Sequence, residues 1–308
     1  MKEKVSKKFG ELYGSGAILF ASPGRINLIG EHTDYNGGFV FPGAVDKGIV
    51  AAIKINGTDK VRAYALDLGE SAEFGLNEAD KPAQSWACYI FGVCREIQKR
   101  GGKIGGFDTV FAGDVPLGAG MSSSAALEST YAFALNDLYN CGIDKFELAK
   151  IGQSTEHNYC GVKCGIMDQF ASVFGKKGCL MRLDCRSMEF GYFPFDPVGY
   201  KLVLLDTVVK HELVGSPYNR RRESCERVAK MLEEADVRGA SLGYDDDVSM
   251  GSFLSYNGGN AGALMLDSLG AQLFSNLHQV RVEGVPEHFY TVYMAYHKKH
   301  VHSRAVTD

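Results

Sequence analysis

The chain has 308 residues, of which 45% are hydrophobic and 23% are charged, and its formal net charge is -4. These values are typical of a soluble globular protein with two domains or one large one. The weakly acidic balance offers no broad basic field, so we expect no nucleic-acid partner. No run of about 18 apolar residues occurs, and the N-terminal segment lacks the apolar core of a signal peptide, so we expect a cytoplasmic protein without a membrane span.

Strand-forming residues dominate the first part of the chain, in segments that turn residues separate. The predicted strands cover residues 17–21, 25–30, 48–55, 61–68 and 107–113, with two later ones at 179–184 and 201–206. The early strands come before the helical patterns and do not alternate regularly with them. This order predicts an α+β fold.

Apolar periodicity predicts a helix from Ser122 to about Asn140. Its buried face is formed by Leu127, Tyr131, Leu135 and Leu138. Later, the segment GIMDQFASVFG fits a short helix over residues 165–175, with Ile166, Phe170 and Val173 on one side.

Two further helices are indicated by their first residues. Asp144 and Glu147 have the spacing of a capping box, which opens a helix that reaches about His157. Ser216 and Pro217 supply an N-cap and a first-turn proline for a helix through residue 236.

The cysteines and the C-terminal histidines could suggest metal sites. The eight cysteines are too sparse for a disulfide scaffold and are expected to be reduced. Cys160 and Cys164 have C-x3-C spacing, but the paired C-x2-C spacing of zinc sites is missing, which favours small buried side chains. His297, His300 and His302 are interpreted as part of a solvated basic tail.

The stretch GDVPLGAGMSSSAALE places small residues and hydroxyls at the start of a helix. The first N–H groups of a helix are unpaired and its dipole is positive there, which favours a bound phosphate. The hydroxyls of Ser122, Ser123 and Ser124 can bind phosphate oxygens or Mg²⁺. The alternative is a serine N-cap after a flexible turn. The stretch matches neither the GxxxxGK[ST] nor the GxGxxG pattern.

Polar side chains also gather near residue 30. Arg25, Glu31, His32 and Asp34 fall within ten residues of SPGRINLIGEHTDYNGG, beside a predicted strand and a Gly-rich turn. Such a cluster suits a polyhydroxylated ligand, whose hydroxyls need both donors and acceptors. A charged surface turn is the alternative.

Two carboxylates follow in EHNYCGVKCGIMDQFASVFG: Glu156 near the end of one helix and Asp168 inside the next. Asp168 is flanked by apolar residues, and a buried carboxylate is costly unless it is paired with a positive charge. Arg25 is the candidate partner.

Four motifs in this order and spacing resemble those of the galactokinases, in the family that groups galactose, homoserine, mevalonate and phosphomevalonate kinases. They are GRINLIGEHTDYNGG, PLGAGMSSSAALE, GVKCGIMDQF and VKHELVGSPYNRRRESCE, and the resemblance covers about residues 8–235. It implies the two-domain GHMP kinase fold. The expected domains are a ribosomal S5 domain 2-like N-terminal domain over 1–200 and a ferredoxin-like C-terminal domain over 201–308 that is incomplete relative to the family.

The resemblance also implies site residues. Asp168 matches the catalytic carboxylate, and Arg25 matches the arginine beside it. Sugar hydroxyls are expected at Glu31, His32, Thr33, Asp34 and Tyr218. The ATP phosphate loop is expected at Gly118, Ala119, Gly120, Met121, Ser122, Ser123 and Ser124. Mg²⁺ is expected at Ser124 and Glu156. Trp86 matches an aromatic residue against adenine, and plain core packing is the alternative.

The implied reaction is ATP-dependent phosphorylation of α-D-galactose at its C1 hydroxyl, by a monomer whose only partners are small molecules. The alternatives are a non-catalytic sensor of galactose and ATP, a kinase of N-acetylgalactosamine, or an inactive truncated galactokinase. The complete SSSAA sequence, together with Asp168 and Arg25, favours an enzyme.

The resemblance ends after about Asp236. The family's third, glycine-rich motif is missing, and the nearest glycine-rich run, residues 256–264, has a different pattern. We expect a reading-frame shift or a truncation, which resequencing of the coding DNA would reveal. The strand at 201–206 and the helix after Ser216 would then lack packing partners and expose apolar surface.

Overall fold

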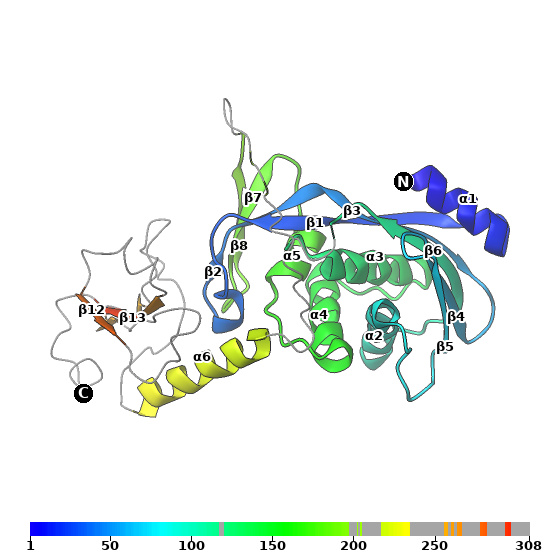
Figure 1. Ribbon diagram of the computed structural model, residues 1–308. Helices are drawn as coiled ribbons and strands as arrows, with labels where there is room; N and C mark the ends of the chain where they lie inside the picture. The colour runs from blue at the N-terminus through cyan, green and yellow to red at the C-terminus, as the bar shows by residue number, and fades with distance from the viewer. Residues whose placement is uncertain are drawn as a thin grey trace. The chain divides into compact units, whose positions relative to one another are not determined.

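The computed structural model describes residues 1–116, 120–196, 202, 204 and 217–234, with five short strands after residue 255 (Figure 1). The five strands are β9 Tyr256–Asn257, β10 Asn260–Ala261, β11 Leu264–Leu266, β12 His278–Arg281 and β13 Tyr293–Tyr296. Several predicted features lie outside the described residues: Gly118, Ala119, Ser216, His297, His300, His302 and most of the strand at 201–206.

The chain divides into two compact units. The first consists of Met1–Ile26, Pro42–Met181 and Tyr192–Tyr218, and the second of Asn27–Phe41, Arg182–Gly191 and Asn219–Asp308. The domain boundary expected near residue 200 stays a prediction. None of the described helices has the length and hydropathy that a bilayer span requires.

A five-stranded sheet forms the base of the first unit, in the order β1-β3-β6-β4-β5. Its strands are β1 Ile18–Asn27, β3 Pro42–Ile55, β4 Lys60–Ala65, β5 Glu70–Gly75 and β6 Phe107–Gly113. The predicted segments at 17–21 and 25–30 merge into β1, which ends before residue 28. β6 matches its predicted bounds, and β5 was not predicted. Because β6 pairs antiparallel with β3 and parallel with β4, it separates two strands that follow each other in the chain.

Helices cover both faces of this sheet. The helices of the larger core are α2 Ser85–Lys99, α3 Ser123–Leu138 and α4 Lys145–Thr155. The short helix α5 Met167–Phe174 follows them in the chain. On β3, Ile49, Ala51 and Ile53 belong to the core shared with α2, α3 and α4, whereas Ala52 points to the other face. This alternation follows the two-residue period of a strand.

The other face is covered by α1 Lys2–Tyr13, which docks through Val5 and Phe9 (Figure 1). Both side chains are fully buried, and burial of one large apolar side chain contributes about 2 to 3 kcal/mol. Two apolar residues at i and i+4 are therefore enough to fix a helix whose other positions are mostly exposed.

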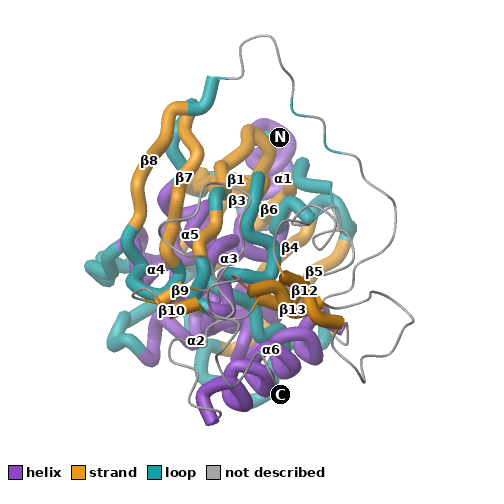
Figure 2. The backbone as a smooth tube through the Cα atoms, turned by 90° about the vertical axis from the view of Figure 1, so that its left-hand side faces the viewer, coloured by secondary structure: helices purple, strands orange, loops and turns teal. Residues whose placement is uncertain are grey.

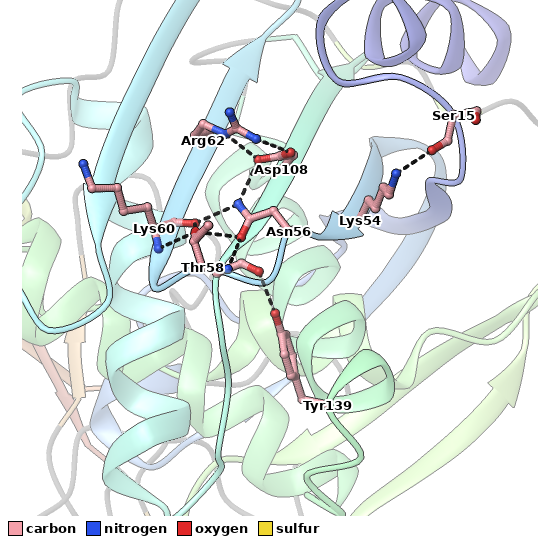
Figure 3. Close-up of polar contacts among 9 residues, drawn as sticks. Ser15, Lys54, Asn56, Thr58, Lys60, Arg62, Asp108 and Tyr139 are labelled. Carbon is pink, nitrogen blue, oxygen red and sulfur yellow. Dashed lines mark hydrogen bonds and ion pairs between the residues drawn. The ribbon is translucent and has the colours of Figure 1, made fainter.

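A polar network fixes the connection between β3 and β4 (Figure 3). Asn56 donates to Oδ1 of Asp108 at 2.9 Å, and Arg62 binds both carboxylate oxygens of Asp108 at 2.7 Å. Tyr139, just after α3, donates to the carbonyl oxygens of Gly105 and Gly106. The network joins the ends of β3, β4 and β6 to α3.

The predicted helices are confirmed with two corrections. Asp144 caps α4 by accepting from the N–H of Glu147 at 3.0 Å, but the Glu147 carboxylate does not reach back to complete a capping box. It pairs instead with Arg100 and Lys150, because these cations lie within reach. The chain also continues beyond α4 as a π-helical turn, η2 Glu156–Cys160, so the regular helix ends earlier than expected.

The second unit contains the segment that follows β1. Its short elements are η1 Asp34–Asn36 and β2 Phe39–Val40. Later in the chain, β7 Cys179–Asp184, β8 Phe190–Pro194 and α6 Pro217–Glu234 each contribute residues to both units. β2 pairs antiparallel with β7, and β7 lies between β2 and β8 in the sheet. Figure 2 shows β7 and β8 side by side. α6 begins at the proline that the sequence predicted as its first residue.

Candidate functional site

Asp168 and Arg25 form an ion pair inside the first unit. Arg25 lies on β1 and Asp168 in the first turn of α5, and the Arg25 Nε and Nη2 atoms both lie 2.7 Å from Oδ1 of Asp168. The side chains are 12% and 29% exposed. The carboxylate thus has the cationic partner that the sequence suggested, and it still reaches solvent.

Ser122 binds the second oxygen of the same carboxylate. Its hydroxyl donates to Oδ2 of Asp168 in a short hydrogen bond. Ser122 precedes α3 with a left-handed backbone (φ 58°), and its side chain makes no capping hydrogen bond. The serine N-cap alternative therefore does not describe Ser122, since its hydroxyl is turned away from the helix amides.

The loop before α3, which we call the serine loop and which the structure describes from Gly120 to Ser122, lies directly against β1. The N–H of Arg25 donates to the carbonyl of Met121 at 3.1 Å, and Arg25 Nη1 donates to the carbonyl of Gly120. A Cβ at Gly24 would lie 2.6 Å from that Met121 oxygen, so only glycine permits this approach. On the other side, Ser172 of α5 donates to the carbonyl of Pro23 at 2.8 Å. These contacts bring β1, the serine loop and the start of α5 together.

Glu156 and Ser124 form a second polar pair beside Asp168. Glu156 opens the π-helical turn and is buried, and it is hydrogen-bonded to Ser124 near the start of α3. Burial raises the pKa of Glu156 to about 7, the Ser124 hydrogen bond lowers it, and the charge of Asp168 raises it. The Oε2 atom of Glu156 has no hydrogen-bond partner.

These two side chains fit a small, hard cation. Mg²⁺ prefers oxygen ligands and is commonly held by one or two protein groups together with substrate phosphates. An unpaired carboxylate oxygen and a neighbouring hydroxyl are such ligands. In the part of the chain that the structure describes, no three Asp, Glu, His or Cys side chains could hold a metal ion by themselves. A cation here would need further oxygens from a bound ligand.

One buried carboxyl group of this region was missed by the sequence analysis. Glu128 of α3 is fully buried, and its Oε2 accepts from Nε2 of Gln169 at 3.1 Å. Burial raises the pKa of Glu128 well above its ordinary value, and the charges of Glu156 and Asp168 add to this effect. Its position could have suggested a role, because a residue four positions after Ser124 lies on the same face of a helix.

The predicted sugar-binding residues lie mostly on the loop around η1. Asn27 donates to Oε1 of Glu31 at 2.9 Å. The Thr33 hydroxyl bonds to the carbonyls of Gly30 and Phe39, at 2.7 and 2.8 Å, so it closes the turn. Asp34 opens the short helix itself.

His32 is held from both sides within the second unit. Its Nδ1 lies 2.7 Å from the Tyr35 hydroxyl, and its Nε2 lies 3.4 Å from Nη1 of Arg221 on α6. An arginine can only donate, so Nε2 accepts and the ring proton lies on Nδ1. Burial lowers the pKa of His32, and the charge of Arg221 lowers it further, whereas Glu31 raises it.

The other two predicted residues occupy different elements. Tyr218 lies in the first turn of α6 and is partly buried. Trp86 of α2 is buried in the core of the first unit, with its ring centroid 5.4 Å from that of Phe111. Its Nε1 donates to Oε2 of Glu70 at 2.8 Å. Trp86 thus packs in the core, and its contact with adenine stays a prediction.

Family models match two parts of the chain. Residues 88–176 match the GHMP kinases N terminal domain, and residues 7–55 match the galactokinase galactose-binding signature. The mevalonate kinase of Methanococcus jannaschii, 22% identical with a TM-score of 0.50, has the same fold over 58% of this chain and 56% of its own. Residues 88–176 therefore form a domain of the GHMP kinase family, and the chain has the GHMP kinase fold.

Beyond this domain, the chain resembles the galactokinases. It is 39% identical to the galactokinase of Clostridium tetani over 234 residues, which are 75% of this chain and 60% of the relative. It is 43% identical to the galactokinase of Clostridium acetobutylicum over 238 residues, which are 76% of this chain and 60% of that relative. The crystal structure of Lactococcus lactis galactokinase complexed with galactose matches with a TM-score of 0.67 and 35% identity, over 74% of this chain and 61% of that one. The chain thus spans about three fifths of these relatives.

Proposed function

We propose that the protein is a sugar kinase that transfers the γ-phosphoryl group of ATP to the C1 hydroxyl of α-D-galactose. The observation that carries this proposal is the carboxylate of Asp168, bound by Arg25 and by Ser122 at the start of α3. It places a carboxylate that can accept a proton beside a helix N-terminus that suits phosphate. The galactose-binding signature over residues 7–55 supports galactose as the sugar.

Asp168 would orient the attacking hydroxyl and take up its proton. Phosphoryl transfer has a loose transition state, so alignment and charge stabilisation supply most of the catalysis. Arg25 would hold the carboxylate in place through the ion pair and offset negative charge on the transferring group. Ser122 would fix the carboxylate through its second oxygen.

The serine loop and the start of α3 would bind the phosphates of ATP. Gly120 and Met121 already turn their carbonyl oxygens toward Arg25 and β1, and the first N–H groups of α3 are available for phosphate oxygens. Ser124 and Glu156 would hold Mg²⁺, which when bound shields the charge of the phosphates. In this proposal Gly118 and Ala119 belong to the same loop, and Ser123, the first residue of α3, also contacts the phosphates.

Glu31, His32, Asp34 and Tyr218 would bind the sugar hydroxyls. A carboxylate accepts hydrogen bonds, whereas a tyrosine hydroxyl both donates and accepts, as recognition of a polyol requires. Thr33 would act through the backbone, because its hydroxyl already bonds to two carbonyls of the loop.

The test is ADP release from the purified full chain with galactose, with N-acetylgalactosamine and with no sugar. We expect release that depends on galactose and on Mg²⁺. ADP release with N-acetylgalactosamine but not with galactose would mean that N-acetylgalactosamine is the sugar substrate. Binding of galactose and ATP without release would identify a sensor. If neither ligand binding nor ADP release is observed, and neither ligand shifts the melting temperature, the proposal is contradicted.

A further inference from the structure

Glu128 and Gln169 form a buried hydrogen bond behind the candidate site. Their side chains come from α3 and α5, and both are almost completely inaccessible to solvent. Gly152 of α4 lies against the pair, since a Cβ there would be 2.7 Å from Cγ of Gln169 and 3.1 Å from Oε2 of Glu128. Three helices therefore meet at this bond, and the meeting leaves no space for a side chain at residue 152.

Stability alone does not explain a carboxyl group at this position. In the part of the chain that the structure describes, Glu128 makes no ion pair, and its Oε1 has no hydrogen-bond partner. The Oε1 of Gln169 is also without a donor. Buried polar groups in such a state cost free energy, and apolar residues of similar volume are often at least as stable. A role in holding neighbouring groups of the candidate site in place would account for such a pair.

The hydrogen bond between Glu128 and Gln169 constrains the first turn of α5. This helix begins after Ile166 without a side-chain capping hydrogen bond, so no cap fixes its start. Asp168 and Gln169 are successive residues of that turn. Asp168 points to Arg25 and Ser122, while Gln169 points to Glu128. The turn is thus held from two directions, and one of the two anchors is the proposed catalytic carboxylate itself.

The other partner belongs to the helix that opens with the serine loop. Glu128 lies one turn after Ser124 on α3, and residues at i and i+4 share a helix face. The bond from Glu128 to Gln169 therefore joins the helix that begins at the proposed phosphate loop to the helix that carries Asp168.

We propose that Glu128 and Gln169 are positioning residues that fix Asp168 relative to the start of α3. This inference rests on the proposed function for its kinetic consequence. Without the bond, the polar link from the first turn of α5 to α3 would be lost, and only apolar packing, as of Phe170, and the contacts of Asp168 itself would hold the turn. The carboxylate would then sample positions away from the attacking hydroxyl. A displacement of about 1 Å can cost about a hundredfold in rate.

The test compares Glu128→Leu, Gln169→Leu and Glu128→Gln in the full chain. The two leucine variants remove one partner each, and we expect kcat to fall about tenfold to a hundredfold while KM for galactose changes less than about threefold. Glu128→Gln keeps an oxygen that can accept from Gln169, so it should stay within about threefold of the wild type. The double leucine variant should be no worse than either single variant, because both remove the same bond.

Thr130→Val is the matched control. Thr130 is also buried on α3, but its hydroxyl bonds to the carbonyl of Ala126 on its own helix and is not hydrogen-bonded to α5. It should leave kcat unchanged. Wild-type kcat in both leucine variants, or losses in kcat that follow a lowered melting temperature and disappear on cooling, would overturn the inference.

Hydrogen exchange of α5 separates this inference from the proposed function. Amides of the first turn of α5 should exchange about tenfold faster in Glu128→Leu than in the wild type or in Thr130→Val. If the wild type released no ADP with galactose, the proposed function would fail, but the exchange rates would still decide the positioning. Equal exchange in all variants would overturn it.

Discussion

Arg25 and Asp168, separated by 143 positions in the chain, form an ion pair in which two guanidinium nitrogens lie 2.7 Å from one carboxylate oxygen. The pair is only partly buried, so the carboxylate is both held and accessible. Because Arg25 occupies one oxygen and Ser122 the other, each side of the carboxylate has a defined donor.

Replacement of Asp168 by Asn removes the proton acceptor and keeps its shape. We expect kcat to fall about 10²- to 10⁴-fold, which corresponds to about 3 to 5 kcal/mol of barrier, with the affinity for galactose largely kept. Steady-state kinetics and calorimetric titration with galactose measure the two effects. Asp137→Asn, an exposed substitution on α3, serves as control. Turnover within threefold of the wild type would remove Asp168 from the proposed role.

Substitutions of Ser124 and Tyr218 should change the binding of different ligands. Ser124→Ala removes a hydroxyl next to Glu156, so we expect about a tenfold weaker use of Mg²⁺ and ATP with little change in galactose binding. Tyr218→Phe should weaken galactose binding and spare ATP. Isothermal titration of each variant with each ligand checks the division. Equal effects on both affinities in both variants would show that the division is wrong.

Glu96 should stabilise the fold in a pH-dependent way. Burial alone would raise the pKa of Glu96, but hydrogen bonds from Lys99, Asn158 and Arg100 outweigh this effect and lower it. A lowered pKa means that the stabilisation is present above the unfolded-state value, near 4.5, and is lost as the pH falls through the folded-state value. Because Lys99 is about half exposed, we expect Glu96→Gln to cost only about 2 kcal/mol at pH 7.

Thermal melting from pH 7 to pH 3 measures this difference. The gap in melting temperature between the wild type and Glu96→Gln should close in acid. The control is Glu73→Gln, because the ion pair of Glu73 with Lys60 lies on the exposed surface and should matter little. A gap that persisted unchanged at pH 3 would mean that the ionised carboxylate is not the source of the stability.

His32 should titrate below the ordinary pKa of a histidine. Burial lowers its pKa and the positive charge of Arg221 adds to this, so Arg221→Ala should move the pKa upward. Because the neutral ring is the favoured folded form, protonation of His32 should decrease stability as the pH falls below about 6.5. NMR titration of the ring, assigned with His32→Gln, follows the change. Arg222→Ala is the control, since Arg222 lies over the Tyr35 ring. An unchanged His32 pKa in Arg221→Ala would contradict the contact.

Local patterns were sufficient for several elements. The apolar spacing of Leu127, Tyr131 and Leu135 predicted the buried face of α3, and the strand at 107–113 was found with its bounds. α3 was found because its large apolar residues recur at helical spacing, and β6 because strand-forming residues lie between turn residues. Burial itself shows no such period in β6, where all residues but the last are buried. α2 and β5 were not predicted. α2 was missed although its apolar side chains are segregated from its polar ones, so the signal was present in the sequence. β5 lies at the edge of the sheet and carries mostly small and charged residues, so its strand pattern is weak.

The part of the candidate site that could be predicted is the ion pair, because a carboxylate in an apolar segment needs a cationic partner. Asp168 in an apolar segment required a cation, and Arg25 in the neighbouring polar motif was the available one. The contact of Ser122 with Asp168 could not be foreseen, because it depends on a left-handed backbone that turns the hydroxyl away from α3. The bond from Glu128 to Gln169 was equally hidden, since in sequence both side chains stand within helices that have apolar neighbours.

Residue types and their spacing decided which chemistry this chain can carry: a carboxylate, a guanidinium, hydroxyls at a helix start and a polar loop. Those choices are local, and the periods and charges of short segments record them. Which of these groups meet was decided only when β1, α3 and α5 packed together, because a hydrogen bond across 143 positions depends on the path of the whole backbone. The same packing turned Glu128 and Gln169, which no local pattern distinguishes from other helical residues, into the bond that joins two helices of the site.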